Sequence, residues 1–357
     1  MFFPNAGVEV NPALLLLLGL IVGTLSGFFG VGGGFLITGG LLVFGVPPLF
    51  AVGTGLTLIM GSALINTLKH RKVGNVDFKL GALMVIGTVP ALFLAERLNS
   101  QLEAWGVAGP VIQYTYVVFL AALGSFILYD YLKARKRSSP LRDQVSTAGL
   151  AQRVHSLRIP PHSIGLPGYV SLSTYVSLPL SRIQRISIWI PIGIGFGVGF
   201  LAGLLGAGGG FILLPVMIYV LGVPTVVAVG TGLFQIVITG FIGTLLYSLS
   251  NHVDLLMVII MLAASSMGSQ LGVAATRFVD GARIRSLFGI TILSAGVAVA
   301  LKQAAESSGF GPLSTLASIL LLGVAGAMCI IVAVILMTRK GRSRRPSPSP
   351  TGREGTH

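Results

Sequence analysis

Two glycine-rich runs are the residues of this sequence whose type and spacing best suit ligand binding. The first reads Gly-Val-Gly-Gly-Gly-Phe at 30–35, and the second reads Gly-Ala-Gly-Gly-Gly-Phe at 206–211. Consecutive residues without side chains let the backbone adopt conformations that are closed to other residues. A helix that begins directly after such a run, at Phe35 in the first copy, presents free N–H groups and the positive end of its dipole to an anion. Small residues can also serve close helix packing, but the occurrence of two copies in register favours a binding role. The candidate substrate-binding residues are therefore Gly32, Gly33, Gly34, Gly208, Gly209 and Gly210.

A hydroxyl group between two glycines follows each run. The pattern Ala-Val-Gly-Thr-Gly stands at 51–55 and again at 228–232. A threonine hydroxyl can hydrogen-bond a desolvated oxyanion or a cation, but it can equally bond a carbonyl of its own helix, and both interpretations stay open here. This pattern adds Gly53, Thr54, Gly55, Gly230, Thr231 and Gly232 to the candidate substrate-binding residues.

Other polar residues lie within or beside the apolar segments. Thr57, Ser62, Gln235 and Thr239 stand inside them and are expected to face the interior of a helix bundle. Of these, Gln235 is included among the substrate-binding candidates. Residues near the ends of the segments are better explained by loop capping or interfacial anchoring: Asn66, Asp77, His252 and Asp254. The small polar stripe at 265–270 is expected to form a helix–helix contact.

Composition indicates the environment of these elements. The chain of 357 residues is 53% hydrophobic and 10% charged, whereas a soluble domain has about 25% charged residues. Continuous apolar runs, most of them near the ~20 residues of a transmembrane helix, predict an all-α polytopic membrane protein and not a barrel. The runs lie at 13–29, 49–68, 80–98, 114–132, 187–206, 225–249, 255–275, 286–301 and 313–338. The single Cys329 excludes disulfides and a Cys-ligated metal, and no cofactor is expected.

The positive charge is concentrated beside the ends of these runs. Nearly all Lys and Arg residues lie in four clusters, at 69–79, 133–185, 277–285 and 339–353. Such clusters mark cytoplasmic segments of a membrane protein, so the net charge of +14 does not indicate nucleic-acid binding. All four clusters lie inside only if the short segments 34–45 and 210–221 each carry the chain across as half-helices, for eleven crossings in all. The N-terminus is then outside and the C-terminus is cytoplasmic.

The two copies define the domain organisation. We expect a first transmembrane repeat at 1–133, a basic cytoplasmic linker at 134–186, a second repeat with an extra span at 187–338, and a disordered tail at 339–357. Because the first repeat begins outside and the second inside, they form two inverted-topology repeats with glycine-interrupted half-helices near the midplane, a recurrent plan of secondary transporters. Within the linker, two Tyr-Val-Ser-Leu runs at 169–172 and 175–178 either pair as a small hairpin or form an irregular connector.

These motifs together resemble the TauE/SafE family, the sulfite-exporter or toluene-sulfonate-uptake-permease group. The resemblance rests on the doubled glycine run, Gly-Val-Pro at 45–47 and 222–224, the two Ala-Val-Gly-Thr-Gly patterns, and Val-Asp at 76–77 and 253–254. It implies a multi-pass permease of the cell inner membrane that moves small sulfur-containing anions such as sulfite or organosulfonates. It also implies fewer crossings than the charge count, with half-helices that re-enter the membrane.

The expected mechanism places two half-helix N-termini of opposite orientation near the midplane, where backbone and hydroxyl donors bind one anion. No cationic residue lies deep in a span to do this instead. The alternatives are an anion channel and a transporter of another small anion. An intramembrane enzyme is disfavoured, because the apolar runs hold almost no acid, base or metal ligands. The expected partners are a small anionic substrate and the lipid bilayer, and homo-oligomerisation is left open.

Overall fold

The computed structural model describes residues 1–72, 74–136, 153–154, 163–164, 172–276, 279, 281–308 and 311–342, and it is built almost entirely of helices. The first unit comprises α1 (Pro12–Phe29), α2 (Gly34–Val43), α3 (Pro48–Lys72), α4 (Phe78–Ala104) and α5 (Ala108–Lys136). The second comprises α7 (Trp189–Leu205), α8 (Gly210–Pro215) with its π-helical continuation η1 (Val216–Val220), α9 (Thr225–Leu249), α10 (Leu255–Thr276) and α11 (Gly281–Ser308). The chain closes with α12 (Pro312–Arg342).

Within the described residues, 8 helices are long and apolar enough to cross a membrane. They are α1, α3, α4, α5, α9, α10, α11 and α12, and α7 is an apolar helix of 17 residues. The predicted class, an all-α polytopic membrane protein, is therefore confirmed.

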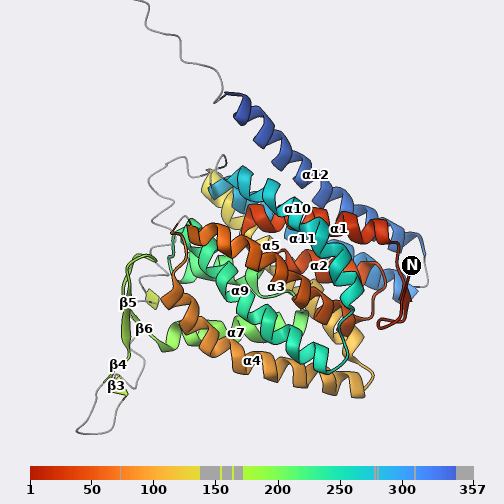
Figure 1. Ribbon diagram of the computed structural model, residues 1–357, viewed down its shortest axis with the longest axis horizontal. Coiled ribbons are helices and arrows are strands. Elements are labelled where there is room, and N and C mark those ends of the chain that lie inside the picture. Colours follow the sequence, from red (N-terminus) through yellow and green to blue (C-terminus); the bar gives the residue numbers. More distant parts are fainter. Residues whose placement is uncertain are drawn as a thin grey trace, which may run out of the picture.

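Helices of one unit pack against helices of the other. Figure 1 shows α4 and α7 along one side of the bundle and α1 with α10 towards the other, while α3 packs on α9 and α5 on α11. Small residues permit the close approach of α1 and α10. A Cβ atom added to any of three α1 glycines would overlap the α10 backbone, Gly19 at Met261, Gly23 at Ser265 and Gly27 at Ser269. The residue numbers of these contacting pairs increase together along both helices, so α1 and α10 run parallel.

The same contacts fix two further pairs of helices. Gly195 of α7 faces Met84 of α4, and Gly199 faces Thr88, so α7 and α4 also run parallel. The third helices of the two units are arranged differently: Gly240 of α9 faces Met60 of α3, whereas Gly243 faces Leu56. Since the numbering falls on α3 as it rises on α9, these two helices run antiparallel.

The extra C-terminal helix α12 lies outside this interlocked bundle. It packs against α11, α1 and α10, and its C-terminal end projects from the bundle in Figure 1.

Short antiparallel strand pairs precede the first helix of each unit. In front of α1, β1 (Phe2–Phe3) pairs with β2 (Val8–Glu9), and in front of α7, β5 (Tyr175–Leu178) pairs with β6 (Ile183–Ser187). A further pair joins β3 (Ser163–Ile164) to β4 (Leu172–Ser173). Of the two alternatives considered for the Tyr-Val-Ser-Leu runs, pairing of one run with the other is therefore wrong for 175–178. The run at 175–178 pairs forward instead, because β6 supplies the buried side chains of Ile183 and Ile186.

Several expectations fall on residues that the structure does not describe. They concern the first three residues of the 169–172 run, most of the linker at 134–186 and nearly all of the tail at 339–357.

Candidate functional site

Both glycine runs interrupt a helix in the same way. Gly30 ends α1 with φ 70° and Gly206 ends α7 with φ 66°. Gly33 and Gly209 are the N-cap residues of the next helices, with φ 71° and 72°. These left-handed conformations favour glycine because it has no Cβ atom. The half-helices begin at Gly34 and Gly210, one residue before the predicted start at Phe35 in the first copy.

The two interruptions lie against each other in the middle of the bundle. A Cβ atom at Gly34 would overlap the carbonyl oxygen of Ala207, and one at Gly210 would overlap that of Val31. Gly32 and Gly208 both face Ile59, with Cβ positions 2.9 and 3.0 Å from its Cγ2 atom. The structure thus brings Gly32, Gly34, Gly208 and Gly210 together between α3 and α9, whereas Gly33 packs on Val22 of α1 and Gly209 on Val198 of α7.

The start of α2 has two amide groups that precede its first intrahelical hydrogen bond. Leu36 and Ile37 both donate to the carbonyl oxygen of Gly33, over 3.0 and 3.2 Å. The amides of Gly34 and Phe35 therefore come before the first intrahelical bond, as the leading N–H groups of every helix do. The 10 residues of α2 also place a dipole end at this position.

At the second interruption, side chains donate hydrogen bonds to the backbone carbonyl groups at the end of α7. Tyr247 donates its hydroxyl to Gly203 O over 3.0 Å, and Asn99 donates its amide to Leu204 O over 3.3 Å. Thr38 of α2 donates to Gly206 O over 2.9 Å. These bonds satisfy carbonyl groups that would otherwise be orphaned in an apolar interior.

The two predicted threonines hold loops of the opposite unit. Asp254 donates its backbone N–H to Thr54 Oγ1 over 3.0 Å, and Asp77 donates its own to Thr231 Oγ1 over 2.9 Å. Both threonines are fully buried. As acceptors in these bonds they keep their hydroxyl protons, so their role as ligands stays a prediction.

The glycines beside these threonines divide into two groups. Gly53 packs on the carbonyl oxygen of His252 and Gly230 on that of Asn75, so both lie against the loops that lead into α10 and α4. Gly55 instead faces Thr38 Oγ1 and Gly206 O, beside the second interruption. Gly232 faces Leu213 of α8 and Met217 of η1.

The aspartates of the two Val-Asp motifs cap helices, as predicted. Asp77 Oδ1 accepts the amides of Lys79 and Leu80, and Asp254 Oδ1 accepts those of Leu256 and Met257, each over 3.1 Å. The second carboxylate oxygens differ. Ser181 donates to Asp77 Oδ2 over 2.6 Å, whereas Asp254 Oδ2 is buried without a hydrogen-bond partner among the described residues.

Gln235 faces the interior, as predicted, and joins helices of both units. Its Nε2 atom donates to Thr88 Oγ1 over 2.7 Å, and Thr88 donates in turn to Gly195 O over 2.9 Å. The Oε1 atom of Gln235 has no partner in the part of the chain that the structure describes.

A buried polar group that the sequence did not reveal lies beside the first interruption. It comprises Ser26 of α1, Ser62 and Asn66 of α3, and Ser265 of α10, and we call it the serine cluster. The interfacial position expected for Asn66 is wrong. Its side chain is 0% exposed, because α3 continues to Lys72 and Asn66 faces α1.

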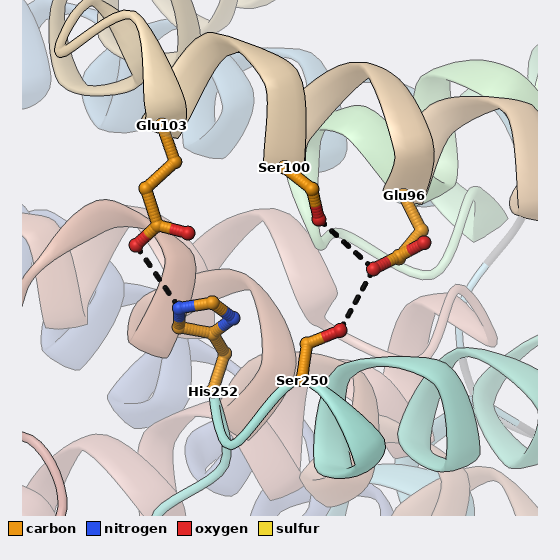
Figure 2. Close-up of polar contacts among 5 residues, drawn as sticks. All are labelled: Glu96, Ser100, Glu103, Ser250 and His252. Atoms are coloured by element: carbon orange, nitrogen blue, oxygen red, sulfur yellow. Dashed lines mark hydrogen bonds and ion pairs between the residues drawn. The ribbon is translucent and has the colours of Figure 1, made fainter.

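A second polar group lies where α4 meets the loop between α9 and α10. Figure 2 shows Glu96, Ser100 and Glu103 of α4 facing Ser250 and His252 of this loop. Glu96 Oε1 accepts both serine hydroxyls, over 3.0 and 2.8 Å, and His252 Nε2 lies 3.1 Å from Glu103 Oε1. These contacts connect α4 to the loop. The position of His252 is explained by this connection and needs no role at the glycine runs.

A bundle of helices long and apolar enough to span a membrane, with two interrupted helices in contact at its centre, is a plan found among membrane transporters, and comparisons with known proteins support this class. The chain belongs to the sulfite exporter TauE/SafE family, whose model matches residues 15–299. It is 27% identical over 298 residues to the probable membrane transporter protein YunE of Bacillus subtilis, covering 79% of this chain and 95% of the relative. It is 24% identical over 210 residues to the probable membrane transporter protein MJ0441 of Methanocaldococcus jannaschii, covering 57% and 60%. No solved structure gives a significant match.

Proposed function

We propose that this transporter is a permease for small sulfur-containing anions, such as sulfite or organosulfonates, in the cell inner membrane. The observation that carries the proposal is the contact between the two glycine runs, Gly34 against Ala207 and Gly210 against Val31. It sets two helix N-termini and their backbone N–H donors beside one central region, and such positions favour anions. The description of the family, sulfite exporter, supports the choice of substrate.

The helix segments around the glycine runs carry no charged side chain, which favours release of a bound anion and therefore transport. Neither 12–68 nor 187–251 contains an Asp, Glu, Lys, Arg or His residue. An anion bound there would be held by dipoles and neutral donors, and would not have to leave a buried ion pair. The same lack of acids, bases and metal ligands supports a protein without enzymatic activity.

The pairing of the helices supports two inverted repeats. The equivalent helices α3 and α9 run antiparallel, and the equivalent threonines, Thr54 and Thr231, each bond a loop of the opposite unit. A twofold relation of this kind allows one unit to rock against the other around a fixed site, as in other transporters with inverted repeats. In this arrangement α2 and the α8–η1 segment each carry the chain across the membrane, so that the linker and the C-terminus are both cytoplasmic.

The test is transport by the purified chain in sealed lipid vesicles. Radiolabelled sulfite and a radiolabelled alkanesulfonate are supplied on one side, and uptake is measured with and without unlabelled anion preloaded on the other. We expect uptake that saturates with concentration and is accelerated by preloading, because a carrier exchanges its substrate across the membrane. Uptake without saturation or counterflow would favour the channel, and uptake of neither anion would contradict the proposed substrate class.

A further inference from the structure

We propose that the substrate's oxyanion group binds at the serine cluster of the first unit, against the N-terminus of α2. This inference rests on the transport function proposed above and assigns it a single binding site. The donors are the hydroxyls of Ser26, Ser62 and Ser265, the amide of Asn66 and the leading N–H groups of α2.

The four side chains of the cluster converge from three helices. Ser62 Oγ lies 3.4 Å from Ser26 Oγ and 3.4 Å from Ser265 Oγ, and Asn66 Nδ2 lies 3.4 Å from Ser26 Oγ. None of the four is more than 1% exposed. The cluster therefore lies inside the bundle, where α1, α3 and α10 meet.

These polar atoms bind one another only weakly. Hydrogen bonds between hydroxyl groups usually measure about 2.7–2.8 Å, and all contacts within the cluster are longer than this. Asn66 Oδ1 has no partner among the described residues, although it is buried. Rotation of the amide by half a turn exchanges its oxygen and nitrogen atoms, so that its free end becomes an N–H donor. A buried group of this kind is costly unless something binds it.

The cluster lies directly beside the start of α2. A Cβ atom at Gly33, the N-cap residue of α2, would lie 3.4 Å from Ser26 Cβ. Ser26 also holds the interruption in place, since its carbonyl oxygen accepts the amide of Gly30 over 2.8 Å. The helix dipole and the side-chain donors can thus act on one bound group.

The second unit does not repeat this arrangement. The residues at the equivalent positions are Ala202 for Ser26, Thr239 for Ser62, Gly243 for Asn66 and Thr88 for Ser265. Of the two hydroxyls that remain, Thr239 donates to Gln235 O of its own helix, and Thr88 donates to Met84 O and Gly195 O. The regular α-helix that follows is also shorter, with 6 residues in α8 against 10 in α2.

The chemistry of the cluster selects a singly charged ligand. Its donors are all neutral, and a second negative charge would be buried without a compensating cation, which is costly. The group that fits is the –SO₃⁻ of an organosulfonate or of hydrogensulfite, and sulfate with two charges should be excluded.

The experiment compares Ser62→Ala and Ser265→Ala with Thr239→Val in the vesicle assay described above. The first two remove a cluster hydroxyl, and the third removes a hydroxyl that bonds its own helix at the position equivalent to Ser62. Hydrogen bonds to charged groups are strong enough that loss of one should raise the apparent KM for alkanesulfonate by about tenfold to a hundredfold. We expect Thr239→Val to keep the KM of the unmodified protein, and sulfate to compete weakly if at all.

The remaining outcomes separate the inference from the proposed function. Unchanged KM in both serine variants would overturn the serine cluster as the site while leaving the transport function intact. An equal rise in Thr239→Val would overturn it too, by showing that any hydroxyl in these helices is needed. If one serine variant does not reach the membrane, the other decides alone. Failure of the unmodified protein to move any sulfur anion would contradict the proposed function, and the site with it.

Discussion

Asp254 donates its backbone N–H to the hydroxyl oxygen of Thr54 over 3.0 Å, which ties α3 of the first unit to the loop that begins α10 of the second. The equivalent bond from Asp77 to Thr231 makes the reciprocal connection over 2.9 Å. In each unit, the threonine between two glycines thus accepts a hydrogen bond from the Val-Asp motif of the other unit. The molecule makes this contact twice.

We expect Thr54→Val and Thr231→Val each to lower the free energy of unfolding by about 1–3 kcal/mol. The substitution keeps the shape of the side chain but leaves a buried amide without an acceptor. The measurement is chemical unfolding of the detergent-solubilised protein, with Thr239→Val as the matched control. A rise in apparent KM at unchanged stability would instead place these hydroxyls on the substrate.

We expect Gly34→Ala and Gly210→Ala to destabilise the protein and to reduce the rate of transport. The added methyl group overlaps the carbonyl oxygen of Ala207 or Val31, and overpacking of this kind costs about 1–3 kcal/mol. Gly197→Ala on α7 is the control, because a Cβ atom there has nothing within 4 Å. Unfolding and vesicle uptake are measured for all three. Wild-type behaviour of Gly34→Ala would show that the two glycine runs are not held in close contact.

The proposed inverted topology predicts which residues an impermeant thiol reagent can reach. In a Cys329→Ser background, cysteine at Asn5 or Asn251 should be labelled from outside the cell, since both side chains are exposed in the structure. Cysteine at Ser138 or Ser343, which lie outside the described residues, should be labelled only after the membrane is opened. Labelling of Asn251→Cys and Ser343→Cys from the same side would contradict the inverted arrangement.

We expect sulfite uptake to increase as the buffer is made more acidic, while alkanesulfonate uptake stays constant. Acid converts sulfite from the dianion to hydrogensulfite, which the neutral serine cluster can bind without burying a second charge. A sulfonate keeps one charge throughout and reports any effect of pH on the protein itself. Parallel pH profiles for the two anions would contradict the selection of a monoanion.

The helices and their interruptions could be predicted from the sequence because their causes are local. Apolar runs of sufficient length form spans wherever they occur in a membrane protein. The glycine runs permit left-handed conformations that are closed to other residues, and Gly33 and Gly209 adopt them. The Val-Asp motif likewise carries its own capping acceptor, so Asp77 and Asp254 were correctly expected at loop ends.

The serine cluster could not be predicted because its cause is tertiary. Ser26 and Ser265 lie on helices that are far apart in the sequence and meet only when α1 packs on α10. Asn66 stands close to Lys69, which suggested an interface, and only its contact with Ser26 reveals the burial. The hairpin failed for a similar reason, since the repeated Tyr-Val-Ser-Leu gave no sign that Ile186 would be the buried partner.

The interlocking of the two units also constrains how such a chain can evolve. Gly34 fits against Ala207 and Gly210 against Val31, so the residues tolerated at these positions in one copy depend on the residues of the other copy. A substitution fixed in one half changes the surface to which the other half must remain complementary. The two copies are therefore free to diverge where they do not contact each other. Along the glycine contacts they must change together.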